Sequence, residues 1–113
     1  MPHDRLQKLY TISKGLNRRF PGNDDPFRIL ARLMEECGEM AGQVHIFEDV
    51  GLKRQKAGAP NPAHLAKEAQ DIITAALHLV MLYNAEADLD RIIDERYRRV
   101  IDEGLVVNQK DST

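Results

Sequence analysis

The chain has 113 residues, with 16 basic and 18 acidic side chains and a net charge of −2. This length is typical of one domain, which excludes an enzyme with separate cofactor and substrate domains. The near-neutral charge excludes a strong positive field that could hold a nucleic-acid backbone. One cysteine cannot form an internal disulfide, and no segment has the roughly 18 uninterrupted apolar residues that span a bilayer. We therefore expect one domain, residues 1–113, in the cytoplasm, that binds neither nucleic acid nor a membrane.

The first predicted helix covers about residues 4–19, where Leu6, Leu9, Leu16 and Phe20 recur near helical spacing. Pro21 and Gly22 are turn formers that end it. Asp24 or Asp25 can cap the next helix, and Pro26 suits a first helical turn. The second helix is therefore expected to start near Phe27.

The second predicted helix continues for about five turns as an amphipathic stripe. Its apolar residues are Leu30, Leu33, Met34, Cys37, Met40, Ala41, Val44 and Phe47. We expect this stripe, including Met34 and Cys37, to pack in the core. Residues 51–62 have no apolar period and contain glycine and proline, which predicts a loop.

A third helix is predicted over residues 63–84, and residues 72–83 are apolar on nearly every face, which is typical of a buried helix. Asp88 is the expected cap of a fourth helix that ends at Gly104, and residues 104–113 are expected to form a frayed tail. No strand pattern appears, so the fold class is all-α, resembling a four-helix bundle. The short chain and the all-round apolar third helix predict a homodimer or homotetramer.

Two pairs of carboxylates stand on the second and third predicted helices. Glu36 and Glu39 are three residues apart, as are Glu68 and Asp71. Residues at this spacing lie on one face of a helix, so the two side chains of each pair can contact one common ligand. An antiparallel helical hairpin would bring the pairs face to face. Glu35 adds a fifth acid, and the nearby cations Arg32 and Lys67 are too few to neutralise all five. Oxygen ligands of this kind suit Mg²⁺, which often takes further ligands from phosphates, and Mn²⁺ could substitute for it.

The two motifs resemble those of a known enzyme family. The segment Glu35-Glu36-Cys37-Gly38-Glu39 is similar to the EExxE motif, and Glu68-Ala69-Gln70-Asp71 to the ExxD motif, of the MazG-type all-α nucleotide pyrophosphohydrolases. The resemblance covers roughly residues 20–101. It implies hydrolysis of a nucleoside triphosphate to the monophosphate and pyrophosphate by a dimer or tetramer. It further implies that Glu36, Glu39, Glu68 and Asp71 bind the metal ion, and that Glu35 orients or deprotonates the attacking water.

The residues that would bind the rest of the nucleotide follow less directly from the sequence. Cations near the leaving pyrophosphate could come from the loop, as Lys53, Arg54 and Lys56, or from the fourth helix, as Arg96, Arg98 and Arg99. Asn17, Phe20, Gln7 and Phe27 could contact the base, although the same residue types also serve ordinary packing or solvation. His78 is two turns beyond Asp71 and is expected to be a hydrogen-bonded histidine rather than a direct metal ligand.

Two other functions remain open from the sequence. Phosphoribosyl-ATP pyrophosphohydrolases have similar acidic motifs and a comparable apolar helix, so the resemblance leaves the substrate undecided. A non-catalytic helical interaction module could also retain the acids as a metal-stabilised scaffold. Turnover of a nucleotide separates the enzymes from the scaffold, and the choice of nucleotide separates the two enzymes.

Overall fold

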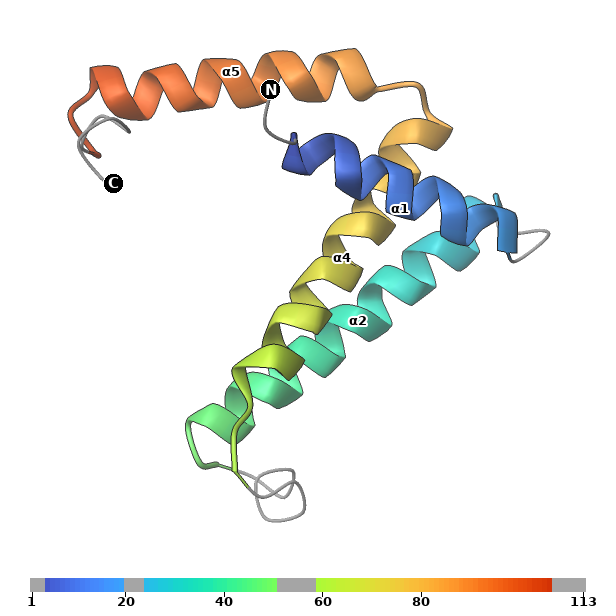
Figure 1. The fold of residues 1–113 in the computed structure, drawn as a ribbon, viewed down its shortest axis with the longest axis vertical. Helices are drawn as coiled ribbons and strands as arrows, with labels where there is room; N and C mark the ends of the chain where they lie inside the picture. The colour runs from blue at the N-terminus through green and yellow to red at the C-terminus, as the bar shows by residue number, and fades with distance from the viewer. Residues whose placement is uncertain (1–3, 20–23, 51–58, 107–113) are drawn as a thin grey trace.

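The computed structural model describes residues 4–19, 24–50 and 59–106, and the regular structure in these ranges is entirely helical. The helices are α1 (Arg5–Arg19), α2 (Pro26–Phe47), α4 (Pro62–Leu82) and α5 (Glu86–Asp102) (Figure 1). The predicted all-α class is confirmed. None of the described helices is long and apolar enough to cross a bilayer.

An antiparallel hairpin of α2 and α4 forms the centre of the molecule, and α1 packs across α4 (Figure 1). The buried apolar side chains come from all three helices: Tyr10 from α1, Ile29 and Ile46 from α2, and Ala75 and Leu77 from α4. The hairpin therefore fixes how the polar faces of α2 and α4 oppose each other, and α1 closes one side of the space between them.

Side-chain caps determine where the two hairpin helices begin. Asp25 Oδ1 accepts a hydrogen bond from the Phe27 backbone N–H at 2.9 Å, and Asn61 Oδ1 accepts one from the Ala63 N–H at 2.9 Å. Each cap is followed by a proline in the first turn, where the missing N–H costs nothing. Asp25, rather than Asp24, is thus the cap of α2, and the predicted start of this helix is confirmed.

The prediction that Asp88 caps the last helix is wrong. The helix starts at Glu86, its N-cap residue is Ala85, and Asp88 lies inside the first turn. The reason is the preceding turn: Asn84 adopts a left-handed conformation, with φ of 55°, and reverses the chain immediately after α4. At the other end, Gly104 follows the last turn with φ of 70°, the conformation that favours glycine there.

One chain does not form a closed four-helix bundle in the part of the molecule described. Among the described helices α5 contacts only α4, and none of its residues is buried (Figure 1). The radius of gyration is 17.2 Å, whereas a compact domain of this length has about 13 Å. The expected bundle is therefore open on the side where α5 leaves α4.

The apolar stripe of α2 divides between two faces instead of packing in one core. Met34 is 63% exposed and Cys37 is also exposed, so the prediction that both are core residues is wrong. They belong to an apolar row on the side of α2 that faces away from α4. We call this row the outer stripe; it consists of Phe27, Leu30, Met34, Cys37, Ala41 and Val44.

Candidate metal centre and adjoining pocket

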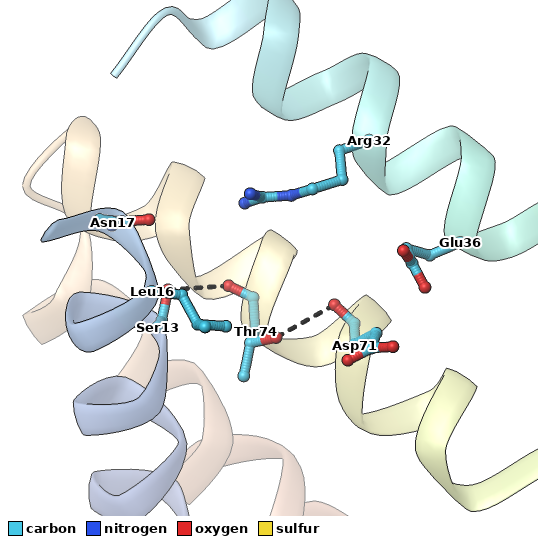
Figure 2. A pocket seen from close by; sticks show the side chains of 7 residues that line it. All are labelled: Ser13, Leu16, Asn17, Arg32, Glu36, Asp71 and Thr74. Carbon is cyan, nitrogen blue, oxygen red and sulfur yellow. Dashed lines mark hydrogen bonds between the residues drawn. The ribbon is translucent and has the colours of Figure 1, made fainter. Parts of the chain in front are cut away.

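The facing sides of α2 and α4 bring the two predicted carboxylate pairs together. Glu36 lies opposite Asp71, and Glu39 lies opposite Glu68, because the two helices run antiparallel. Carboxylate oxygens of Glu36, Glu39 and Glu68 all lie within 4.8 Å of one another. Figure 2 shows Glu36 and Asp71 pointing toward each other from their two helices. Three of the four residues expected to bind a metal ion, Glu36, Glu39 and Glu68, therefore meet between α2 and α4. Asp71 lies near Glu36 but is not a member of this group.

The burial of these acids is uneven. Glu68 is 6% exposed, Glu36 is half-buried, and Glu39 is exposed. Within the described part of the chain, Glu36 Oε2 and Glu68 Oε2 are buried and have no hydrogen-bond partner. A buried carboxylate oxygen without a partner costs free energy, so these two atoms call for a cation or a donor between the helices.

The carboxylates perturb one another's protonation. Burial is the main cause that raises the pKa of Glu36, and the negative charges of Asp71 and Glu68 raise it further. The hydrogen bond that protonated Glu39 donates to Glu68 raises the pKa of Glu39. The same hydrogen bond, with one from Lys67, lowers the pKa of Glu68. The centre therefore holds a proton more firmly than separate glutamates would, which is the response of crowded negative charge.

Lys67 supplies positive charge to the α4 side of the centre. Its Nζ lies 3.0 Å from Asp71 Oδ2 and 3.1 Å from Glu68 Oε1. These two carboxylates raise the pKa of the lysine, which keeps it charged. The Lys67 side chain is 64% exposed, so it can swing away without disturbing the core. A divalent cation bound by Glu68 and Asp71 would take the place of this ammonium group.

A pocket adjoins the carboxylates on the side that α1 covers. Its volume is about 200 Å³. Three helices line it: Ser13, Leu16 and Asn17 come from α1, Arg32 and Glu36 from α2, and Asp71 and Thr74 from α4 (Figure 2). The buried Ser13 hydroxyl donates a hydrogen bond to the Thr74 carbonyl at 3.0 Å, which fixes α1 against α4. Two of the expected metal ligands thus form one wall of a cavity that a ligand could enter.

A buried histidine lies next to this pocket and links two charged residues. His78 is 2% exposed, its Nδ1 lies 3.3 Å from Arg32 Nη2, and its Nε2 lies 3.3 Å from Asp24 Oδ1. His78 was expected to be hydrogen-bonded, but its partners could not be identified from the sequence. The sequence indicates Arg32 only as a cation near the acidic motifs. Its place in the lining of the pocket is evident only from the structure.

The remaining predicted site residues occupy different places. Glu35 is exposed beside Glu36 and does not line the pocket. Asn17 lines it, and its Oδ1 is buried without a partner among the described residues. In one chain, Arg96, Arg98 and Arg99 are exposed on α5, which does not approach the pocket. Phe20, Lys53, Arg54 and Lys56 lie outside the described residues. Of the two other base-contact candidates, Gln7 is exposed and Phe27 is 79% exposed, and neither lines this pocket.

The chain matches no protein-family model, no curated protein and no solved structure.

Proposed function

We propose that this protein is a Mg²⁺-dependent hydrolase that converts a nucleoside or deoxynucleoside triphosphate to the monophosphate and pyrophosphate. The proposal rests on the motif resemblance to MazG-type enzymes and on the meeting of the two motifs. The observation that carries it is the cluster of Glu36, Glu39 and Glu68, whose oxygens lie within 4.8 Å of one another beside a pocket.

The residues present fit a hard divalent cation. The candidate ligands are all carboxylates, which a hard cation prefers. Within the described residues, the buried oxygens Glu36 Oε2 and Glu68 Oε2 have no hydrogen-bond partner, and a bound cation would satisfy both. Glu36, Glu39, Glu68 and Asp71 would hold it. A bound Mg²⁺ would neutralise phosphate charge and polarise the α-phosphate. Mn²⁺ has similar ligand preferences and is the expected substitute.

The chain's own residues have separate tasks in this reaction. The carboxylates of α2 and α4 bind the cation, and the pocket beside them holds the substrate next to it. Glu35, one residue before Glu36 and open to solvent, accepts a proton from the attacking water. The water oxygen forms a bond to the α-phosphorus, the bond from that phosphorus to the bridging oxygen breaks, and pyrophosphate leaves.

The experiment is hydrolysis of a panel of nucleotides with Mg²⁺, scored for monophosphate and pyrophosphate. The panel contains canonical and modified triphosphates and phosphoribosyl-ATP. It therefore tests for a nucleoside triphosphate pyrophosphohydrolase and for a phosphoribosyl-ATP pyrophosphohydrolase. EDTA-treated protein should be inactive, and added Mg²⁺ or Mn²⁺ should restore activity. Hydrolysis at an undiminished rate in EDTA would refute the metal mechanism. Tight Mg²⁺ binding without turnover of any nucleotide would instead indicate a non-catalytic scaffold.

We also propose that the active form contains at least two copies of the chain. The outer stripe of α2 repeats at alternating spacings of three and four residues, which is the period of helices that pair along their length. Its members Phe27, Leu30, Met34 and Val44 are between 46% and 79% exposed. The apolar residues Ile92, Ile93 and Tyr97 of α5 are also more than 40% exposed. A second copy would cover both surfaces, and the open shape of one chain would then be closed by its partner.

A further inference from the structure

The lining of the pocket beside the carboxylates also contains a positive charge. Arg32 is the only basic residue among those that line it in the described ranges. It stands one helical turn before Glu36 on α2, which is about 6 Å along the helix axis. A triphosphate whose metal-bound part lay at Glu36 would therefore have a neighbouring phosphate within reach of the Arg32 guanidinium.

Arg32 is not engaged by the acid that would ordinarily neutralise it. A basic and an acidic residue four apart on a helix commonly form an ion pair, but within the described residues no ion pair joins Arg32 to Glu36. Figure 2 shows the two side chains diverging: Glu36 points toward Asp71, and the Arg32 guanidinium extends toward the α1 side of the pocket. Its positive charge thus lies in the cavity, and no carboxylate of the described residues forms an ion pair with it.

His78 accounts for this orientation. Arginine only donates hydrogen bonds, so His78 Nδ1 must accept the one from Arg32 Nη2 at 3.3 Å and must carry no proton. The ring proton therefore lies on Nε2, which donates to the Asp24 carboxylate at 3.3 Å. Because His78 is 2% exposed, it holds the guanidinium from a rigid position in the core. The other N–H groups of Arg32 form no hydrogen bond or ion pair within the described residues, so they can donate to an anion.

We propose that Arg32 binds the phosphate chain of the substrate, and that His78, itself held by Asp24, is the residue that positions Arg32. This inference rests on the proposed function, because it names the group that recognises the triphosphate of that reaction. It divides the pocket into a metal-binding wall of carboxylates and a phosphate-binding corner formed by one arginine. Guanidinium suits this task because its planar donors match two oxygens of a phosphate.

The first test measures binding of inorganic pyrophosphate with Mg²⁺ by calorimetry, beside nucleotide hydrolysis. Arg32→Gln should weaken pyrophosphate binding at least tenfold and raise KM in proportion, while Mg²⁺ affinity without pyrophosphate stays within twofold. Arg32→Lys should recover part of the affinity. The matched control is Arg28→Gln, one turn earlier on α2, where the side chain is 73% exposed; it should bind pyrophosphate like the wild type. Unchanged binding by Arg32→Gln would overturn the proposal.

The second test separates positioning from folding. His78→Leu should weaken pyrophosphate binding in the wild-type background but add nothing in the Arg32→Gln background, since its effect passes through Arg32. His78→Asn, whose amide oxygen can replace Nδ1 as acceptor, should restore much of the affinity. If His78→Leu does not fold, Asp24→Ala provides the same comparison, because the Asp24 side chain is 80% exposed. An equal loss with and without Arg32 would overturn the positioning role.

The two proposals fail differently. If the wild type hydrolyses nucleotides and Arg32→Gln retains its KM and pyrophosphate affinity, the phosphate-binding role of Arg32 is wrong and the activity stands. If the wild type hydrolyses none of the nucleotides but binds pyrophosphate in a manner that depends on Arg32, the activity is wrong and the anion site stands.

Discussion

In the proposed reaction we assign different roles to Asp71, which would bind the metal ion, and Glu35, which would accept a proton from the attacking water. Asp71 faces Glu36 across the hairpin and forms an ion pair with Lys67. Glu35 is exposed, and it precedes Glu36 by one residue on α2. Asp71→Asn should weaken Mg²⁺ binding together with turnover, because an amide carries no negative charge. Glu35→Gln keeps its size but cannot take a proton, so kcat should fall by roughly 10²–10⁴ with Mg²⁺ and nucleotide affinity nearly unchanged.

Calorimetry and single-turnover rates on both variants measure this separation. The assignment of Glu35 to the water would be refuted if Glu35→Gln retained the full rate. It would also be refuted if that variant lost Mg²⁺ as severely as Asp71→Asn does.

The raised pKa of Glu36 has a consequence for stability. A carboxyl whose pKa is higher in the folded chain than its ordinary value of 4.5 binds more protons when folded, so its contribution is present below that pH and is lost as the pH rises above it. Glu39 acts in the same direction, while Glu68, whose pKa is lowered, acts below 4.5 and in the opposite sense. The metal-free protein should therefore lose stability as the pH rises from 4.5 toward neutrality.

The test is the melting temperature in EDTA across that pH range for the wild type and Glu36→Gln. The variant should show a shallower decline, because the neutral amide removes one of the two responsible groups. Added Mg²⁺ should raise the wild-type curve most near neutral pH, where the carboxylates are ionised. Parallel curves for the two proteins would show that Glu36 does not contribute to this pH dependence.

At the scale of elements, α1 is the helix that completes the pocket, and the Ser13 hydroxyl contributes a buried hydrogen bond that holds it against α4. Ser13→Ala removes the buried hydrogen bond to the Thr74 carbonyl and should cost about 1 kcal/mol of unfolding free energy. It should also raise KM, since α1 carries Asn17 into the pocket. Thr11→Ala is the matched control on the same helix. Among the described residues its exposed hydroxyl bonds only to the Gln7 carbonyl, one turn earlier on the same helix, so neither quantity should worsen.

Denaturant unfolding and steady-state kinetics of both variants provide the measurement. A Ser13→Ala protein that was as stable as the Thr11→Ala protein and had the same KM would show that α1 does not depend on this contact for its position.

The elements were predictable to the extent that local chemistry sets them. Asp25 followed by Pro26 marks the start of α2, and Gly104 marks the end of α5, because caps and left-handed turns act within a few residues. The predicted start of α5 is wrong because aspartate is a common N-cap residue, which made Asp88 the expected cap. In the structure the chain turns earlier, at Asn84, and the helix begins at Glu86. Asparagine adopts the left-handed conformation more readily than most residues, so Asn84 itself was a sequence signal for a turn at this point.

The sequence predicted which carboxylates of α2 and α4 lie near one another, but not which residue faces which. The spacing of the motifs placed two acids on one face of each helix, and an antiparallel hairpin made their meeting expected. Which residue faces which depends on how far α4 slides along α2, and no local pattern specifies that register. The contact between Arg32 and His78 depends on the same register, so it could be found only in the folded chain.

At the scale of the whole molecule, periodicity identified the apolar residues of α2 but could not show what covers them. A helical stripe has the same pattern whether it packs against its own chain or against a second copy. The exposed Met34 lies in the middle of the outer stripe and on the opposite side of α2 from the carboxylates. It is therefore the position where assembly can be tested with least effect on the site.

We predict that the wild type has at least twice the mass of one 12.9-kDa chain in solution. Met34→Lys should reduce it to a monomer, because a charge in the middle of a buried apolar interface is costly. Met34→Leu keeps the side chain apolar with similar volume and should leave the assembly intact. The measurement is light scattering at micromolar concentration for all three proteins. A monomeric wild type would contradict the assembly itself, whereas an oligomeric Met34→Lys would show that a different surface, such as the exposed apolar residues of α5, joins the copies.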